Sequence, residues 1–101
     1  MIVPKLLPLI HPGEHLFEDF MQPLGISRNA LARELRVPPQ RISEIVKGRR
    51  GISADTALRL GRHFNTSPEF WITLQTKFDL RSTMEVVGPE LRLVRARRVA
   101  A

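Results

Sequence analysis

Apolar residues recur every three or four positions through most of the chain between residues 12 and 80, as they do along the buried face of an α-helix. Residues that favour helix starts divide this pattern into separate segments. A proline or a hydroxyl-bearing residue stands at the start of each segment, at Pro12, Ser27, Pro39, Ser53 and Ser67. The sequence therefore predicts an all-α fold of five helices.

Two short helices joined by a tight turn are predicted for residues 27–47, SRNALARELRVPPQRISEIVK. The first helix carries the small Ala32 on its apolar face, which lets the next helix cross closely over it. Pro38 and Pro39 end the first helix, and Pro39 suits the opening position of the second. The second helix has an inner apolar stripe of Ile42, Ile45 and Val46. This spacing is typical of a helix-turn-helix.

The outer face of the second helix is polar and rich in hydrogen-bonding groups. If this helix enters a DNA major groove, base edges would be read by Gln40, Arg41, Ser43, Glu44 and Lys47. Residues at the two ends of the motif would contact phosphates, namely Ser27, Arg28, Arg49 and Arg50. The alternative is an ordinary pair of amphipathic helices with a solvated basic face, which any small helical bundle contains.

Charge favours the first interpretation, because it is concentrated on this motif. Residues 27–50 contain seven basic side chains against Glu34 and Glu44, which gives this segment a net charge of +5. The whole chain has a net charge of +6 and a pI near 11.3. Such a balance favours a polyanionic partner, with nucleic acid ahead of an acidic protein or an anionic membrane surface. The chain has no cysteine and no apolar run of the roughly 20 residues that a membrane span needs.

The two ends of the chain differ from the helical region, so we divide it into an arm at 1–11, a domain at 12–80 and a tail at 81–101. Two prolines interrupt the apolar arm, which is expected to be extended and either to fold back on the core or to dock on a partner through residues such as Ile2, Leu6 and Leu9. The tail contains Gly88 and Pro89 and is expected to be irregular and basic.

Candidate chemistry is sparse elsewhere. Phe70 and Trp71 on the fifth helix either close the core or leave an aromatic face for a second subunit or another partner. The pairs His11 with His15 and Glu14 with Glu18 are one turn apart but match no metal-ligand motif, so we interpret them as surface residues and expect neither metal nor cofactor. No nucleophile, carboxylate pair or phosphate loop indicates an enzyme.

The run HPGE at 11–14 and the run LARELRVPPQRISEIVKGRRGISADTALRLGRHFNTSPEFWITLQTKFDL at 31–80 closely resemble the HigA-type antitoxins. These belong to the phage-repressor-like (Cro/CI, XRE) helix-turn-helix family. The resemblance implies a five-helix domain, a homodimer in the bacterial cytoplasm, double-stranded operator DNA as a ligand and repression of the protein's own operon. It also implies a cognate messenger RNA endonuclease toxin of the RelE/HigB type, neutralised by direct binding. Where the family often has glycine, this chain has Arg36, which would cost roughly 1 kcal/mol in a left-handed conformation.

A stand-alone helix-turn-helix repressor without a toxin is the alternative, and a short basic reading frame next to this gene would favour the antitoxin. For the toxin surface the sequence favours the arm. Residues 1–26 have a net charge of −2 because they contain Glu14, Glu18 and Asp19 against one lysine. This charge suits a basic partner, which the arginine-rich tail would repel.

Overall fold

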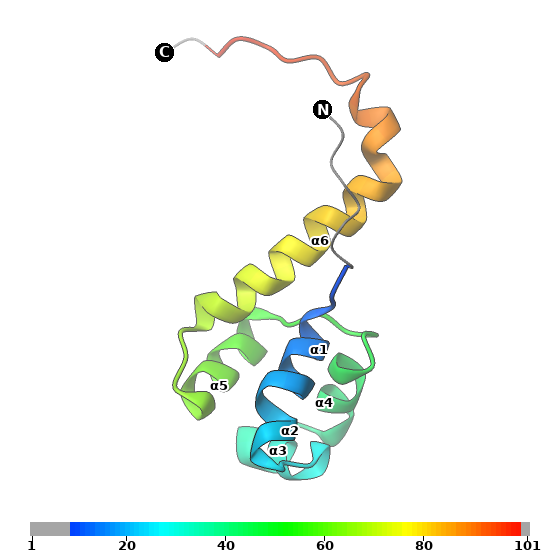
Figure 1. The fold of residues 1–101 in the computed structure, drawn as a ribbon. Coiled ribbons are helices and arrows are strands. Elements are labelled where there is room, and N and C mark those ends of the chain that lie inside the picture. The colour runs from blue at the N-terminus through cyan, green and yellow to red at the C-terminus, as the bar shows by residue number, and fades with distance from the viewer. Residues whose placement is uncertain (1–8, 100–101) are drawn as a thin grey trace.

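The computed structural model describes residues 9–99, and these form five helical units without a strand (Figure 1). The first unit is continuous and consists of α1 (Pro12–His15), a π-helical stretch η1 (Leu16–Met21) and α2 (Gln22–Leu24). The other four are α3 (Arg28–Leu35), α4 (Pro39–Val46), α5 (Ala54–Phe64) and α6 (Pro68–Leu91). The predicted all-α helix-turn-helix fold is confirmed. None of the helices in this part of the chain has the length and apolarity to cross a membrane.

Three helices begin where the sequence predicted a serine cap. The hydroxyl oxygens of Ser27, Ser53 and Ser67 accept hydrogen bonds from the third backbone N–H that follows, at 3.1, 3.3 and 3.2 Å. Helix ends also follow the expected chemistry, because α3 and α5 stop at left-handed residues, Arg36 with φ of 61° and Asn65 with φ of 58°. Arg36 thus adopts the left-handed conformation although it stands where the family often has glycine.

The core is one apolar cluster to which all five units contribute. Its largest member is Trp71, which is 0% exposed, packs against Phe20 at 4.9 Å between ring centroids, and donates its indole N–H to the Thr66 hydroxyl at 2.9 Å. The suggestion that Trp71 contacts a toxin or second subunit is wrong, because the ring is enclosed by its own domain. Phe70 beside it remains 40% exposed.

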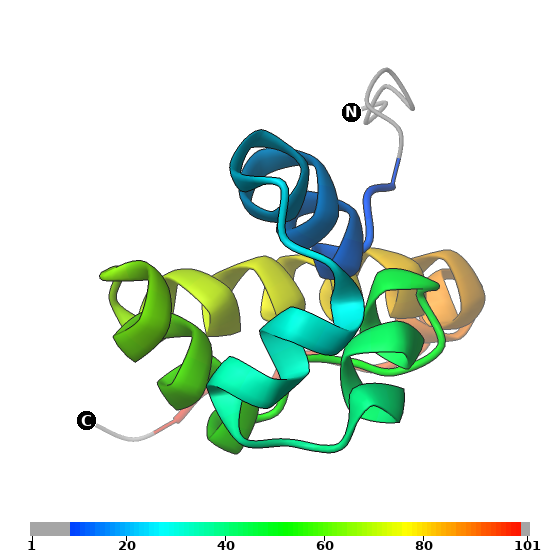
Figure 2. The ribbon, with the colours of Figure 1, turned by 90° about the horizontal axis from the view of Figure 1, so that it is seen from below.

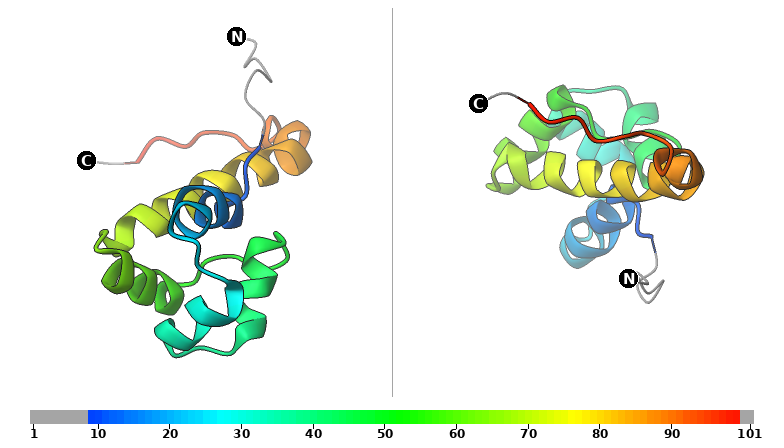
Figure 3. Two further views of the ribbon diagram at one scale, coloured as in Figure 1. Left: turned by 60° about the horizontal axis from the view of Figure 1, so that its bottom comes forward. Right: turned by 90° about the horizontal axis from the view of Figure 1, so that it is seen from above.

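The tail is not irregular from residue 81 as predicted, because α6 continues to Leu91 and crosses the top of the domain before extending past it (Figures 1 and 3). In the described part of the tail, residues 92–99 lack regular structure. Pro89 lies inside this helix. A proline in a helix interior lowers helix stability by about 3 kcal/mol but does not forbid the helix. Of the predicted arm, Ile2 and Leu6 lie outside the described residues, and Leu9 is half-buried.

The HPGE segment packs the start of the first helix against α6 and against the end of α4. Nδ1 of His11 accepts a hydrogen bond from Gly13 N–H at 2.9 Å, and the ring packs edge-on against Phe78 at 4.8 Å. Burial lowers the pKa of His11 below its usual 6.5 and outweighs the negative charges of Asp79 and Glu14, which would raise it. Nδ1 therefore remains an acceptor at neutral pH. Pro12 supplies the first helical position and is buried.

Gly13 brings the backbone of α1 against the carbonyl of Ile45 on α4, and a Cβ built there would lie 1.8 Å from that oxygen. Because the obstruction is backbone, neither partner can rotate away. We predict that Gly13→Ala lowers the free energy of unfolding by about 1 to 3 kcal/mol, measured by urea denaturation.

Gly88→Ala is the matched control, because its Cβ would meet only the Met84 sulfur at 3.7 Å. Within a helix this change should leave stability unchanged or raise it by up to about 1 kcal/mol. Equal unfolding midpoints for Gly13→Ala and the wild type would contradict the close contact between α1 and α4.

Candidate nucleic-acid interface

The helix-turn-helix consists of α3, a three-residue turn and α4, which Figure 2 shows from below. Ala32 on α3 is fully buried, as are Ile42 and Ile45 on α4. The small side chain lets the two helices approach, and the two isoleucines fix which side of α4 faces inward. The opposite side of α4 is therefore presented to solvent.

A carboxylate lies at the centre of this outer face. Glu44 accepts a hydrogen bond from the Gln40 amide at 3.1 Å and another from Arg50 Nε at 2.8 Å. Three of the predicted DNA-contacting residues are thus brought together. The cluster neutralises one arginine and leaves the carbonyl oxygen of Gln40 exposed as an acceptor for a base donor.

The other predicted base-reading residues fall into two groups. Ser43 is half-buried and accepts a hydrogen bond from Arg28 Nη1 at 3.3 Å, while Arg41 is paired with Asp55 at 2.5 Å. Lys47 is exposed, and its ammonium group has no ion pair or hydrogen-bond partner within residues 9–99. Lys47 is therefore the unneutralised cation of the predicted base-reading set.

The four predicted phosphate-contacting residues lie at the two ends of the motif. Ser27 already accepts a backbone N–H as a cap, so its hydroxyl proton remains to donate. Arg28 is bonded only to a neutral hydroxyl and keeps its full charge. Arg49 is exposed and unpaired in the described region, whereas Arg50 is neutralised by Glu44. Among the predicted DNA-contacting residues, free positive charge therefore comes from Arg28, Lys47 and Arg49.

Sequence reasoning missed Gln75, a residue of α6 that supports the loop after α4. Its side-chain oxygen accepts the Ile52 N–H at 2.7 Å, and Gly51 lies so close that a Cβ there would be 3.0 Å from the amide. The two partners are 23 residues apart. No local signal links them, because a single glutamine on a helix is ordinarily a solvated residue.

Histidines and acidic residues do not gather into a metal site in the described part of the chain, where no group of three such side chains has the required proximity. His15 instead pairs with Asp19 at 3.0 Å and His63 with Glu34 at 3.2 Å. His11 is used as a helix cap. The remaining chemistry of the surface is that of charge and hydrogen bonding.

In α3 and α4, two short helices joined by a tight turn pack against each other, and the second presents a polar side to solvent. This arrangement defines the helix-turn-helix class of DNA-binding domains. The helix-turn-helix family model matches residues 18–71. Virulence-associated protein I of Dichelobacter nodosus is 52% identical over 75 residues, which cover 74% of this chain and 69% of that protein.

Two solved structures agree with this assignment. The antitoxin HigA of Pseudomonas aeruginosa with the higBA promoter has a TM-score of 0.86 and 40% identity, covering 91% of this chain and 100% of that one. The antitoxin GraA in complex with its operator has a TM-score of 0.85 and 44% identity, covering 99% and 100%. The chain belongs to the helix-turn-helix family and, within it, to the HigA-type antitoxins, which confirms the resemblance seen in the sequence.

Proposed function

We propose that this protein binds operator DNA as a homodimer, represses its own operon and neutralises a messenger RNA endonuclease toxin of the RelE/HigB type in the bacterial cytoplasm. The observation that carries the DNA-binding part is the orientation of α4, whose buried isoleucines Ile42 and Ile45 leave its polar face outward. The complexes of HigA and GraA with promoter or operator DNA support the same ligand. The proposal requires no cofactor and no catalytic step.

In the proposed complex α4 lies in the major groove. Gln40, Glu44 and Lys47 meet base edges, together with Arg41 and Ser43, while phosphates are bound by Ser27, Arg28, Arg49 and Arg50. A dimer with twofold symmetry would read a palindrome whose half-sites are about 34 Å apart. The duplex for testing this is the segment immediately upstream of the operon.

Gln40→Ala should weaken binding to that duplex by about 1 to 3 kcal/mol and leave binding to random DNA nearly unchanged, because a base contact acts only on the cognate sequence. Arg28→Ala should weaken both and reduce the salt slope by about one, because a phosphate contact is independent of sequence. Fluorescence anisotropy at several salt concentrations measures both quantities. Equal losses on the two duplexes for Gln40→Ala would remove it from the base-reading set.

The C-terminal part of α6 supplies a surface for a second copy. Leu80, Met84, Val87 and Leu91 are four, three and four residues apart, the spacing of a coiled-coil seam. Leu80 is 68% exposed, Met84 56% and Leu91 43%, because this part of the helix extends past its own domain. At 100° per residue this seam is roughly opposite Trp71, which faces the core. An exposed apolar stripe of this kind is expected to be covered by a partner.

A matched pair of charge insertions tests the seam. Leu80→Glu should shift the protein from dimer to monomer, because a carboxylate in the seam must lose its hydration when two helices pack. Val86→Glu should leave the dimer intact, since Val86 is 79% exposed and lies about 120° away from the seam. Sedimentation equilibrium gives the dissociation constants, and equal constants for both variants would assign the dimer contact to another face.

The toxin surface that we propose is separate from α4 and comprises the arm and the first helix. Ile10 is 40% exposed and, with Glu14, Glu18 and Asp19, lines a shallow hollow on the outer side of the first helix. The negative charge of this hollow suits a basic protein. We propose Leu9 for apolar contacts with the toxin, together with Ile2 and Leu6, which are proposed from the sequence alone. The exposed Phe70 is a further candidate for contact with a toxin or a second subunit.

Co-expression with the toxin encoded beside this gene tests the proposal. The Arg41→Ala, Lys47→Ala double mutant should still rescue growth and co-purify with the toxin, because α4 is not the proposed contact. A chain lacking residues 1–10 should fail to rescue while still binding operator DNA. Rescue by the shortened chain would overturn the role of the arm, and failure of the intact chain to rescue would favour a stand-alone repressor.

A further inference from the structure

An acidic side chain joins the recognition helix α4 to α5. Oδ2 of Asp55, in the first turn of α5, accepts hydrogen bonds from Arg41 Nη1 at 2.5 Å and from Arg59 Nε at 2.9 Å. These two donors, Arg59 first, lower the pKa of Asp55 below its ordinary value, so the carboxylate stays ionised at neutral pH. Asp55 is thus shared between an arginine of α4 and an arginine of its own helix.

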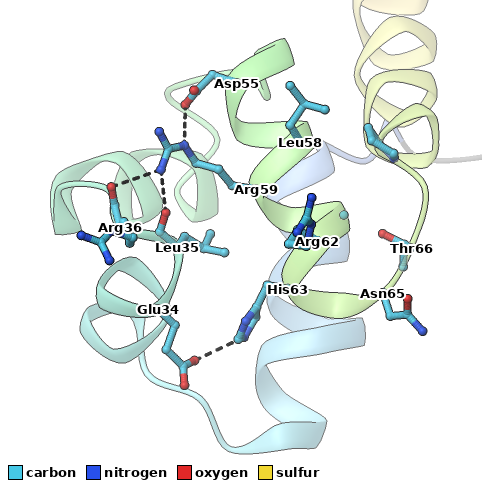
Figure 4. Close-up of a pocket in the computed structure, with 12 residues that line it drawn as sticks. Glu34, Leu35, Arg36, Asp55, Leu58, Arg59, Arg62, His63, Asn65 and Thr66 are labelled. Carbon is cyan, nitrogen blue, oxygen red and sulfur yellow. Dashed lines mark hydrogen bonds and ion pairs between the residues drawn. The ribbon is translucent and has the colours of Figure 1, made fainter.

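The other end of the Arg59 guanidinium holds the turn between α3 and α4. Its Nη1 donates to the backbone carbonyls of Leu35 at 2.8 Å and Arg36 at 3.3 Å, as Figure 4 shows. These carbonyls end α3 at the left-handed Arg36, where the helix leaves its last acceptors without intrahelical partners. A continuous set of hydrogen bonds therefore runs from the end of α3 through Arg59 and Asp55 to Arg41 in the first turn of α4.

The position of Arg41 decides what this arrangement does on DNA. An arginine that is free at the surface binds any phosphate within reach and adds equally to cognate and random binding. An arginine held through one nitrogen by a carboxylate is restrained, and its Nε and Nη2 edge remains for a bidentate contact with O6 and N7 of a guanine. Arg41 is half-buried, with its side chain 26% exposed, which is consistent with restraint.

We propose that Asp55 is a specificity-determining positioning residue, which holds Arg41 for a guanine at the operator and keeps it from acting as a sequence-independent phosphate contact. The proposal rests on the DNA binding proposed above. Asp55 itself touches no base, and its effect on recognition passes through Arg41.

Asp55→Asn tests this inference, because it keeps the size of the side chain and removes the charge that holds Arg41. The ratio of operator to random affinity should fall about tenfold, and the salt slope on random DNA should steepen by about one as Arg41 is released to a phosphate. The control is Glu69→Gln, which makes the same charge change in the first turn of α6, where Glu69 has no side-chain partner among the described residues. Equal effects of the two variants would overturn the proposal.

Arg41→Ala separates positioning from simple electrostatics. In the wild-type background it should lower the operator preference without reducing the salt slope, in contrast to Arg28→Ala. Combined with Asp55→Asn it should abolish the steeper slope, and a slope that stays steep without Arg41 would overturn the inference. A wild-type chain with no operator preference would refute the DNA-binding proposal itself, whereas an unchanged preference in Asp55→Asn would refute only the role of Asp55. The Arg41→Ala slope decides the question if Asp55→Asn does not fold.

Discussion

The burial of one side of α4 is the constraint on which the rest of the structure depends. This helix has eight residues, too few to be stable alone in water. It is held from beneath by Ile42 and Ile45 in the core, at its end by the close approach of Gly13, and at its start by Arg41. The remainder of the domain serves to keep this short helix on the surface with its polar side outward.

Charge pairing modifies the simple view of a basic motif. Counting side chains in residues 27–50 gives a strongly positive segment, but Glu44 neutralises Arg50, and Asp55, from outside the segment, is shared by Arg41 and Arg59. The residual charge lies on Arg28 and Arg49 at the two ends of the motif, on Lys47 at the end of α4, and on Arg33 and Arg36 in α3 and the turn. Phosphate attraction is thus placed around the reading face, while hydrogen-bonding groups that distinguish bases lie within it.

The long helix α6 has two apolar sides with different roles. Trp71 and Phe78 face the domain, and Phe78 packs against His11 at the start of the first helix. The stripe from Leu80 to Leu91 lies on the opposite side, beyond the domain. Gly88 and Pro89 are the reason that the sequence predicts an irregular segment here, because both residues are unfavourable inside a helix. The stripe is nevertheless present in the sequence at coiled-coil spacing.

The sequence by itself determined the five helices, the serine caps of three of them and the inward side of α4, because each depends on residues within one or two turns of each other. Only the tertiary structure decided that Trp71 is enclosed and that Gln75 supports the loop after α4. It also decided which arginines of the motif are neutralised. These properties arise from contacts between residues distant in the chain, and neither periodicity nor local charge records such pairings.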